Sequence, residues 1–252
     1  MNSVSKKAII GENVKIGEYS IIKDDVVIGD NVEISSNVLV DDGARISDNV
    51  KIGHGTVVSV PPQDLKYGGE KTYFEIGKDT VIREYVTLNR GTKHSGKSVV
   101  GNNCFLMSYV HVAHDCRVGN NVVIANAANM GGHVEIGDWA VVGGLVPIHQ
   151  FVKIGAHSII GGGFRTVKDI PPYILAGNVP LKFEGINYIG LKRRGFSSGQ
   201  ITKIRDVYRI IYQSKYNVSD ALKIIETEFE QDENVNIIIN FIKSSTRGIV
   251  KG

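Results

Sequence analysis

Cysteine is scarce in this chain. Its 252 residues include only Cys104 and Cys116, with no spacing typical of a disulfide framework. So few thiols favour a reducing compartment, and we expect a cytoplasmic protein. Long apolar runs are also missing, both at the N-terminus (MNSVSKKAII), where a signal peptide would lie, and in the lengths that cross a membrane. We therefore expect neither a signal peptide nor a membrane span.

Net charge is low as well, at a formal +3, and gives no reason to expect a nucleic-acid partner. The charge is unevenly distributed, however. From Lys192 to Lys215 there are seven basic residues and one acidic residue, Asp206. This local excess predicts an anionic partner or substrate for the C-terminal part of the chain. A solvated helix face is the alternative interpretation.

What the chain has in quantity is a six-residue repeat. Aliphatic residues recur in steps of six from Ile10 to Val58, from Ile76 to Leu88 and from Val100 to Ile160. A period of six fits neither a helix nor an alternating strand. It is typical of a parallel β-helix, in which each hexad makes a short strand and a corner, and three hexads make one coil. The pattern resembles the left-handed hexapeptide-repeat β-helix of the acyltransferase superfamily.

Two interruptions and a change of period divide the chain. Polar stretches with Gly or Pro predict loops at residues 61–74 and 93–98. From Ser197 onward the apolar spacing becomes helical, with Ser197 and Gln200 as a capping box, and predicts three helices. We thus predict a mostly β fold, with a left-handed parallel β-helix at residues 1–190 and a C-terminal α-helical domain at residues 191–252.

The β-helix brings distant polar residues to one edge. Residues 18 apart lie above one another on consecutive coils, about 4.8 Å apart. His114, Gly132 and Gln150 should therefore form one column, with His133 and His149 beside it. His111, in the same HVAHDC stretch, is expected at a corner.

Three interpretations fit this cluster. The histidines could bind Zn²⁺ between subunits, as in gamma-class carbonic anhydrases, but a zinc site would not explain the helical tail or the basic stretch, so we expect no metal. A structural scaffold would not gather polar residues on one edge. Acyl transfer explains them best: His114 acts as a general base, and Gly132 lets a backbone N–H approach the oxyanion.

Five motifs make the similarity more specific. They are QDLKYGGE, HVAHDC, GGHVEIGD, HQFVKIGAH and GLKRRGF. Together they resemble the UDP-N-acetylglucosamine O-acyltransferases that begin lipid A synthesis in Gram-negative bacteria, over nearly the whole chain. The resemblance implies a homotrimer with active sites between subunits and no cofactor. It also implies that a 3-hydroxyacyl chain moves from acyl carrier protein to the 3-position of UDP-N-acetylglucosamine.

The resemblance also implies roles for single residues. His114 matches the general base and Gly132 the oxyanion glycine, while Gly162 matches a residue that sets acyl-chain length. The residues implied to bind substrate are Gln63, Asp64, Lys66, His111, His133, His149, Gln150, Asn187, Arg193 and Arg194. The chain departs from the family pattern at Ile189, where an acidic residue is usual.

Two alternatives stay open at this point. An imidazole base serves a 3-amino sugar as well as a 3-hydroxyl, so the acceptor atom is not fixed. A β-helical acetyltransferase that uses acetyl-CoA and a nucleotide sugar is the other possibility, although GLKRRGF favours the lipid A family.

Overall fold

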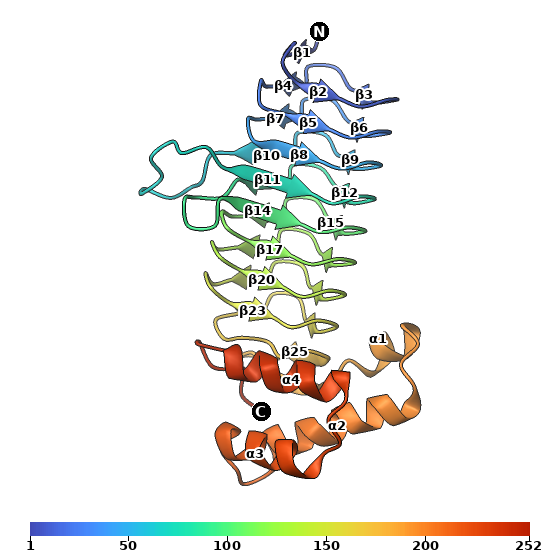
Figure 1. Cartoon of the computed structure of the whole chain (residues 1–252), viewed down its shortest axis with the longest axis vertical. Coiled ribbons are helices and arrows are strands. Elements are labelled where there is room, and N and C mark those ends of the chain that lie inside the picture. Colours follow the sequence, from blue (N-terminus) through green and yellow to red (C-terminus); the bar gives the residue numbers. More distant parts are fainter.

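The computed structural model describes residues 1–252 and has two parts, a long triangular column of strands and a group of helices at its end (Figure 1). Most strands are only two residues long, because each hexad provides only a short side of the coil. They form three sheets, here called A, B and C, which are parallel except where the last strand, β26 Lys182–Ile186, runs antiparallel to β25 Ile174–Gly177. Before these two, successive strands along the chain pass from one sheet to the next. The predicted fold class, a mostly β parallel β-helix followed by helices, is confirmed.

The strands of the three sheets, in order along the column, are as follows. Sheet A contains β1 Ser3–Val4, β4 Ile21–Ile22, β7 Leu39–Val40, β10 Val57–Val60, β13 Thr87–Asn89, β16 His111–Val112, β19 Asn129–Met130 and β22 Pro147–Ile148. Sheet B contains β2 Ile9–Ile10, β5 Val27–Ile28, β8 Ala44–Ile46, β11 Tyr73–Ile76, β14 Lys97–Val100, β17 Arg117–Val118, β20 Glu135–Ile136 and β23 Lys153–Ile154. Sheet C contains β3 Lys15–Ile16, β6 Glu33–Ile34, β9 Lys51–Ile52, β12 Val81–Ile82, β15 Phe105–Leu106, β18 Val123–Ile124, β21 Val141–Val142, β24 Ile159–Ile160, β25 Ile174–Gly177 and β26 Lys182–Ile186.

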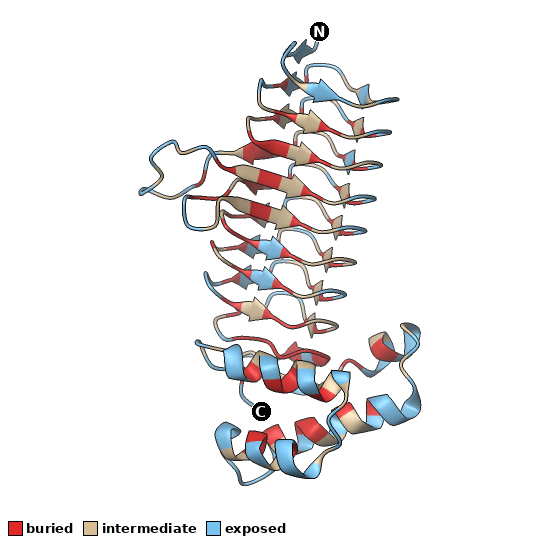
Figure 2. Cartoon of the chain, viewed as in Figure 1, coloured by how far each residue is buried: buried red, intermediate tan, exposed pale blue.

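The repeating aliphatic residue of each hexad points into the column. From Ile22 to Ile160 these side chains are buried, whereas Ile10 is 36% exposed because no coil covers the N-terminal end (Figure 2). The small residue four positions later is also buried, as at Ser20, Thr56, Cys104 and Cys116. The inside of a coil is narrow, so close packing of these side chains provides the hydrophobic stabilisation of the column.

Both insertions leave the column between sheet A and sheet B. Val58 pairs with Leu88 across the first insertion and Leu88 pairs with Val112 across the second, where an uninterrupted coil has a step of 18. Both loops end two residues earlier than predicted, and the second also begins three residues earlier. The first spans residues 61–72, because β11 begins at Tyr73, and the second spans 90–96, because β14 begins at Lys97. Phe74 and Ser98 are buried in the sheet rather than in loops.

Four helices close the C-terminal end of the column: α1 Tyr188–Arg193, α2 Ser198–Gln213, α3 Val218–Glu228 and α4 Glu233–Ser244. The capping box at Ser197 and the three helices predicted beyond it are present. Helix α1 was not predicted, and it begins before residue 191. The Tyr208 hydroxyl on α2 donates to the Pro172 carbonyl at 2.5 Å, which joins the helices to the column. No helix combines the length and apolar character needed to cross a membrane.

Candidate active site

The polar cluster lies at the corner where the chain passes from sheet A to sheet B. We call residues 113–116, 131–134 and 149–152, together with loops 61–72 and 90–96, the A–B corner. Asp115, His133 and Phe151 hold equivalent positions on three consecutive coils, with φ between 59° and 63°. Non-glycine residues rarely adopt this left-handed conformation, so these side chains occupy positions where the repeat favours Asn or Gly.

Gly132 makes room for the imidazole of His114. The two residues lie on neighbouring coils, as the 18-residue step predicts. A Cβ at position 132 would come within 2.5 Å of Cε1 and 2.7 Å of Nε2 of His114. The N–H of Gly132 donates no hydrogen bond within the chain, whereas that of His133 donates to the His114 carbonyl at 3.0 Å. The ring therefore packs directly on main chain, beside an unused backbone donor.

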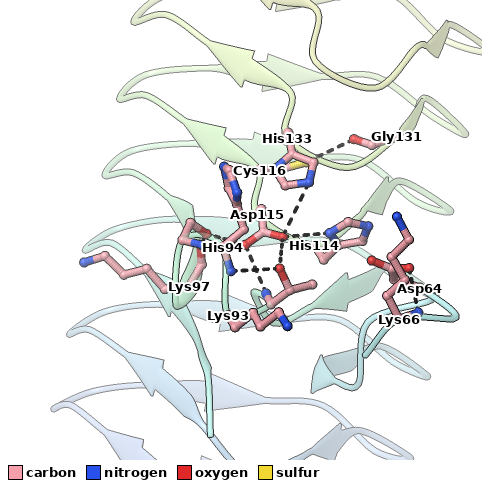
Figure 3. Close-up of polar contacts among 12 residues, drawn as sticks. Asp64, Lys66, Lys93, His94, Lys97, His114, Asp115, Cys116, Gly131 and His133 are labelled. Carbon is pink, nitrogen blue, oxygen red and sulfur yellow. Dashed lines mark hydrogen bonds and ion pairs between the residues drawn. The ribbon is translucent and has the colours of Figure 1, made fainter. Parts of the chain in front are cut away.

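Asp115 orients this imidazole from its other side. Nδ1 of His114 lies 2.8 Å from Oδ2 of Asp115, whose side chain is completely buried (Figure 3). Burial alone would raise the pKa of Asp115, but hydrogen bonds from Ser95, His114 and Thr92 hold that pKa well below its usual range. An ionised carboxylate can only accept. The Nδ1 nitrogen therefore carries the proton, and Nε2 is left with a lone pair.

His133 lies on the coil that follows the His114–Asp115 pair. Its ring stacks on Phe151 at a centroid distance of 4.4 Å and meets the rings of His114 and His94 edge-on, at 5.2 and 4.8 Å. Burial lowers the pKa of His133, which favours the neutral ring near neutral pH. Its Nε2 is 3.8 Å from Asp115, beyond hydrogen-bonding distance. A neutral ring at this position can bind a polar substrate group.

His111 was expected at a corner, and this expectation was wrong. It lies on β16, with its side chain on the outer face of sheet A, because Val112 is the inward residue of that strand. Its Nδ1 is 2.6 Å from the Thr87 hydroxyl, and burial lowers its pKa. His111 is thus a half-buried neighbour of His114, held by the coil before it.

The first loop reaches the same corner. Figure 3 shows Asp64 and Lys66 on this loop, on the side of the cluster where His114 lies. Oδ1 of Asp64 accepts from the Lys66 N–H at 3.0 Å, and neither side chain forms a hydrogen bond or ion pair with a histidine. Leu65 between them is fully exposed, and so is most of Gln63. The tip of the loop therefore presents its side chains away from its own column.

His149 and Gln150 continue the corner toward the helices. Both are exposed, and Nδ1 of His149 lies 3.0 Å from the Gln150 carbonyl oxygen. The backbone of Gln150 passes close to Gly131, where a Cβ would come within 2.8 Å of its nitrogen. His149 and Gln150 are therefore one coil beyond Gly132, on the same edge.

The three residues assigned to the nucleotide lie elsewhere. Asn187 is 4% exposed and caps α1: it accepts from the Gly190 N–H at 3.1 Å and donates to the His157 carbonyl at 2.8 Å. Its amide group thus serves as a helix cap, and the expected contact with the nucleotide stays a prediction. Arg193 is exposed, and Arg194 lies over the Trp139 ring at 5.3 Å. Trp139 and His157 belong to the corner between sheets B and C, so one chain does not bring these arginines to His114.

The basic stretch is less free than the sequence indicated. Lys203 forms ion pairs with Glu230 and Asp232, and Arg209 pairs with Asp206. These partners come from the loop between α3 and α4 and from α2 itself. Lys192, Arg193 and Lys215 remain exposed and form no ion pair. The unpaired positive charge that could attract an anionic partner is therefore smaller than the seven basic residues indicated.

The ligand atoms of His114, Asp115 and His133 lie within 4.8 Å of one another, close enough in principle for a metal. The donor set argues against that use. Asp115 already accepts a hydrogen bond from His114 and others from Thr92 and Ser95. A metal would have to replace these bonds, whereas proton transfer uses them as they are.

Sequence reasoning missed several residues of this corner. Thr92, His94 and Ser95 on the second loop contact the cluster, and Phe151 supports His133. The position of the two insertions in the repeat could have identified these residues. Because both insertions fall between a sheet-A hexad and a sheet-B hexad, they must emerge at the corner that carries His114.

Comparisons with known proteins show which family this chain is similar to. Residues 169–250 match the family model described as UDP-N-acetylglucosamine O-acyltransferase, domain 2, and residues 7–42 and 97–132 match the bacterial transferase hexapeptide model. A curated acyl-[acyl-carrier-protein]–UDP-N-acetylglucosamine O-acyltransferase from Chlorobaculum parvum is 55% identical over 97% of this chain and 93% of its own length. One from Paraburkholderia phymatum is 42% identical, with coverage of 98% and 97%. The crystal structure of a UDP-N-acetylglucosamine acyltransferase from Bacteroides fragilis superimposes with a TM-score of 0.97 at 46% identity, covering 99% of this chain and 98% of that one.

Proposed function

Because this chain belongs to the UDP-N-acetylglucosamine O-acyltransferase family, we propose that it transfers an acyl chain from acyl carrier protein to UDP-N-acetylglucosamine. More narrowly, we propose a 3-hydroxyacyl chain and the sugar 3-hydroxyl, the first step of lipid A synthesis. The observation that carries the mechanism is the His114–Asp115 pair packed against Gly132. It supplies a base, an orienting carboxylate and a backbone donor within one corner.

The chemistry follows from these three groups. Nε2 of His114 takes the proton of the sugar hydroxyl as its oxygen attacks the thioester carbon, because an alcohol is too weak a nucleophile unaided. The thioester oxygen becomes an oxyanion, which the free N–H of Gly132 stabilises. When the intermediate collapses, the carbon–sulfur bond breaks and the imidazolium returns its proton to the leaving thiolate. Asp115 keeps Nδ1 protonated throughout.

We propose that the enzyme works as a homotrimer with each site formed between two chains. One chain holds His114 on the A–B corner and Arg193 and Arg194 beyond a different corner, so a substrate that uses both must bridge two subunits. An apolar column on the outside of sheet C supports the same arrangement. Its residues are Val81, Phe105, Val123, Val141 and Ile159. These side chains are only half-buried in the single chain, and subunit contact would cover them.

The substrate contacts divide between the two ends of such a site. His133, His149 and Gln150 supply polar groups for the sugar, and Gln63, Asp64 and Lys66 reach outward from the first loop. Arg193 and Arg194 suit the diphosphate, because guanidinium groups bind phosphate oxygens in pairs. The capping role of Asn187 is indirect: it fixes the start of α1 and so the direction of the two arginines. Lys192 and Lys215 add positive charge for the acidic surface of acyl carrier protein.

Gly162 is proposed as the residue that sets acyl-chain length. The alternative was that a tight corner requires glycine there. The left-handed conformation belongs to Gly163, however, and a Cβ at Gly162 would meet the Gly144 carbonyl oxygen at 3.2 Å, a tight contact, and the Gly144 nitrogen at 3.6 Å. Next to it lies a cavity of about 690 Å³ whose lining includes Gly163, Phe164, Val167, Val179 and Leu181. The lining also includes the basic residues Arg165, Lys168, Lys182 and Lys251. The apolar part of this cavity supports a long acyl chain.

Mass spectrometry of the products tests the function. Purified protein receives UDP-N-acetylglucosamine or its 3-amino analogue, each with 3-hydroxyacyl-carrier-protein or with acyl- and acetyl-CoA. We expect one O-acylated nucleotide sugar, formed from the carrier-protein donor. If only the amino sugar gave product, the acceptor would be a 3-amino group instead of the 3-hydroxyl. If only acetyl-CoA gave product, the protein would be an acetyltransferase and the proposal would be wrong. The two unpaired buried thiols, Cys104 and Cys116, support a cytoplasmic site of action.

A further inference from the structure

The second loop encloses the carboxylate of Asp115. Oδ1 accepts from the Thr92 N–H at 3.0 Å and from the Ser95 N–H at 3.3 Å, and it also contacts the Ser95 hydroxyl. Oδ2 accepts from the Thr92 hydroxyl at 2.8 Å and from His114. A loop from another part of the sequence thus supplies every donor to this buried carboxylate except the imidazole itself.

The loop is built to hold these donors in place. The Gly96 N–H donates to the Thr92 carbonyl at 2.8 Å, which closes a tight turn around Thr92 and Ser95. The Lys93 N–H donates to Glu70 of the first loop at 3.1 Å, so the two loops brace each other. The Ser95 hydroxyl has one proton and two acceptors in reach, Asp115 and the Lys97 carbonyl at 2.8 Å. The ionised carboxylate is the stronger acceptor.

We propose that Thr92 and Ser95 are positioning residues for the acyl transfer, which set the orientation and charge of Asp115 and through it the basicity of His114. This inference rests on the proposed function of the His114 site. Removing a donor leaves more negative charge on the carboxylate, and that charge stabilises the imidazolium. The base should then stay protonated to higher pH. A freer carboxylate would also let the ring rotate away from Gly132.

Other titratable groups face the pair and must be considered in any pH profile. His133 lies on the next coil, His94 on the same loop, His111 on β16 and Asp64 on the first loop, all near enough to act electrostatically on the histidines. None of them donates a hydrogen bond to Asp115. A shift in the pH profile that acts through Asp115 should therefore disappear when Asp115 is substituted, whereas a shift caused by these neighbours should remain.

The same insertion offers a matched control. Ser98 lies on β14 directly after the loop, and its buried hydroxyl has no hydrogen-bond partner. Ser98→Ala removes a buried hydroxyl from this segment without touching the carboxylate. Ser95→Ala and Thr92→Val remove hydroxyls that do touch it, and Thr92→Ser keeps the donor while trimming the methyl group.

The experiment measures kcat and kcat/KM against pH for the folded variants. We expect Ser95→Ala and Thr92→Val each to lower kcat about 10-fold, the size of a hydrogen bond to a charged group. The acidic limb of kcat/KM should move up by about 0.5 pH units. Thr92→Ser and Ser98→Ala should behave as wild type. In an Asp115→Asn background, Ser95→Ala should have little further effect, because the two act in series.

A readout without turnover separates this inference from the proposed function. The rate at which diethylpyrocarbonate modifies His114, followed by peptide mass spectrometry across pH, should show the same upward shift in Ser95→Ala. A wild-type protein that makes no product would refute the function and leave this measurement intact. Unchanged profiles and modification rates in folded Ser95→Ala and Thr92→Val would overturn the inference. An activity loss that persists in the Asp115→Asn background would overturn it as well.

Discussion

Two corners of the same β-helix use one backbone conformation for opposite purposes. The B–C corner, where the chain passes from sheet B to sheet C, has an Asn or Asp in the left-handed region on six coils: Asn13, Asn31, Asn49, Asp79, Asn103 and Asn121, with φ of 54–61°. Several of these side chains form a hydrogen bond with the equivalent residue on the next coil. The Asn49 amide, for example, donates to the Asp79 carboxylate at 2.9 Å. The A–B corner holds Asp115, His133 and Phe151 at 59–63°.

The difference shows where function is placed in a repeat. Asparagine tolerates the left-handed region, so the B–C corner obeys the repeat and stabilises the column. Histidine and phenylalanine tolerate it less well, and on the next two coils of the B–C corner Trp139 and His157 adopt it too. What distinguishes the A–B corner is that Asp115 and His133 belong to the candidate site. Residues of a catalytic corner should therefore contribute less to the free energy of unfolding than residues of a structural corner with the same backbone conformation. Substitutions there should change activity more.

The largest effect should come from the base of the A–B corner. His114→Ala should lower kcat about 10² to 10⁴-fold while the protein stays folded, because general-base catalysis contributes that much. His54→Ala is the matched control, since His54 packs edge-on against Tyr85 away from this corner. Steady-state kinetics with circular dichroism checks both. Near-normal turnover in folded His114→Ala would remove the base from the mechanism.

The arginines next to the B–C corner should affect the nucleotide sugar next most strongly. Arg193→Ala and Arg194→Ala should each raise KM for the UDP-sugar about 10- to 100-fold, the value of a charge-assisted hydrogen bond. Arg194→Lys should raise this KM as well, although it keeps the positive charge, because lysine lacks the planar group that lies on Trp139. Lys215→Ala is the control for charge alone. A KM increase confined to acyl carrier protein would assign the arginines to donor docking instead.

Exchanging residues between the corners tests the comparison directly. His133→Asn puts the structural residue at the catalytic corner, and we expect equal or higher stability with an about 10-fold higher KM for the UDP-sugar. Asn121→His is the reciprocal change at φ 57°. It should reduce the free energy of unfolding by about 1 kcal/mol and leave kinetics unchanged. Thermal unfolding and KM measured together decide this, and equal effects from both exchanges would refute the distinction.

Chain-length selection should respond in smaller steps. Gly162→Met should shift the preferred 3-hydroxyacyl donor to shorter chains, with about a four-fold change in kcat/KM per methylene excluded, since each buried methylene contributes about 0.8 kcal/mol. Gly185→Ala on β26 is the structural control, because strain at φ 130° should lower stability without changing the optimum. An unchanged optimum in folded Gly162→Met would take Gly162 out of this role.

Much of the column was predictable because its rule is local. Each aliphatic residue and each corner recurs at a fixed step, so Val112, Met130 and Ile148 stack as the period requires, and Gly132 meets His114. The contacts of Thr92 and Ser95 were not predictable, because both residues lie within an insertion of irregular shape whose backbone follows no period. Helix α1 was missed for a related reason: six residues are too few to show helical periodicity. The Asn187 cap depends on that helix.

The smallest expected effect concerns His157, the histidine of the B–C corner. Its ring stacks between Trp139 and Tyr173, and its Nδ1 is buried without a partner. Burial, and then the positive charge of Arg194, lower its pKa from 6.5 to about 4. Between these values the unfolded chain binds a proton that the folded protein does not. Stability should therefore fall as pH decreases from about 6.5 toward 4.

His157→Phe tests that sign. Phe151 adopts the same backbone conformation at φ 63°, so the corner accepts the ring, and phenylalanine keeps the stacking without a titratable nitrogen. We expect urea midpoints at pH 7.5, 6.0 and 5.0 to fall less steeply in His157→Phe than in wild type, at one protein concentration, since association affects stability. Activity should be unchanged, because this corner only supports the fold around Arg194. If the two pH curves ran parallel, another group would be responsible for the acid sensitivity, and the B–C corner would contain no titrating residue that matters for stability.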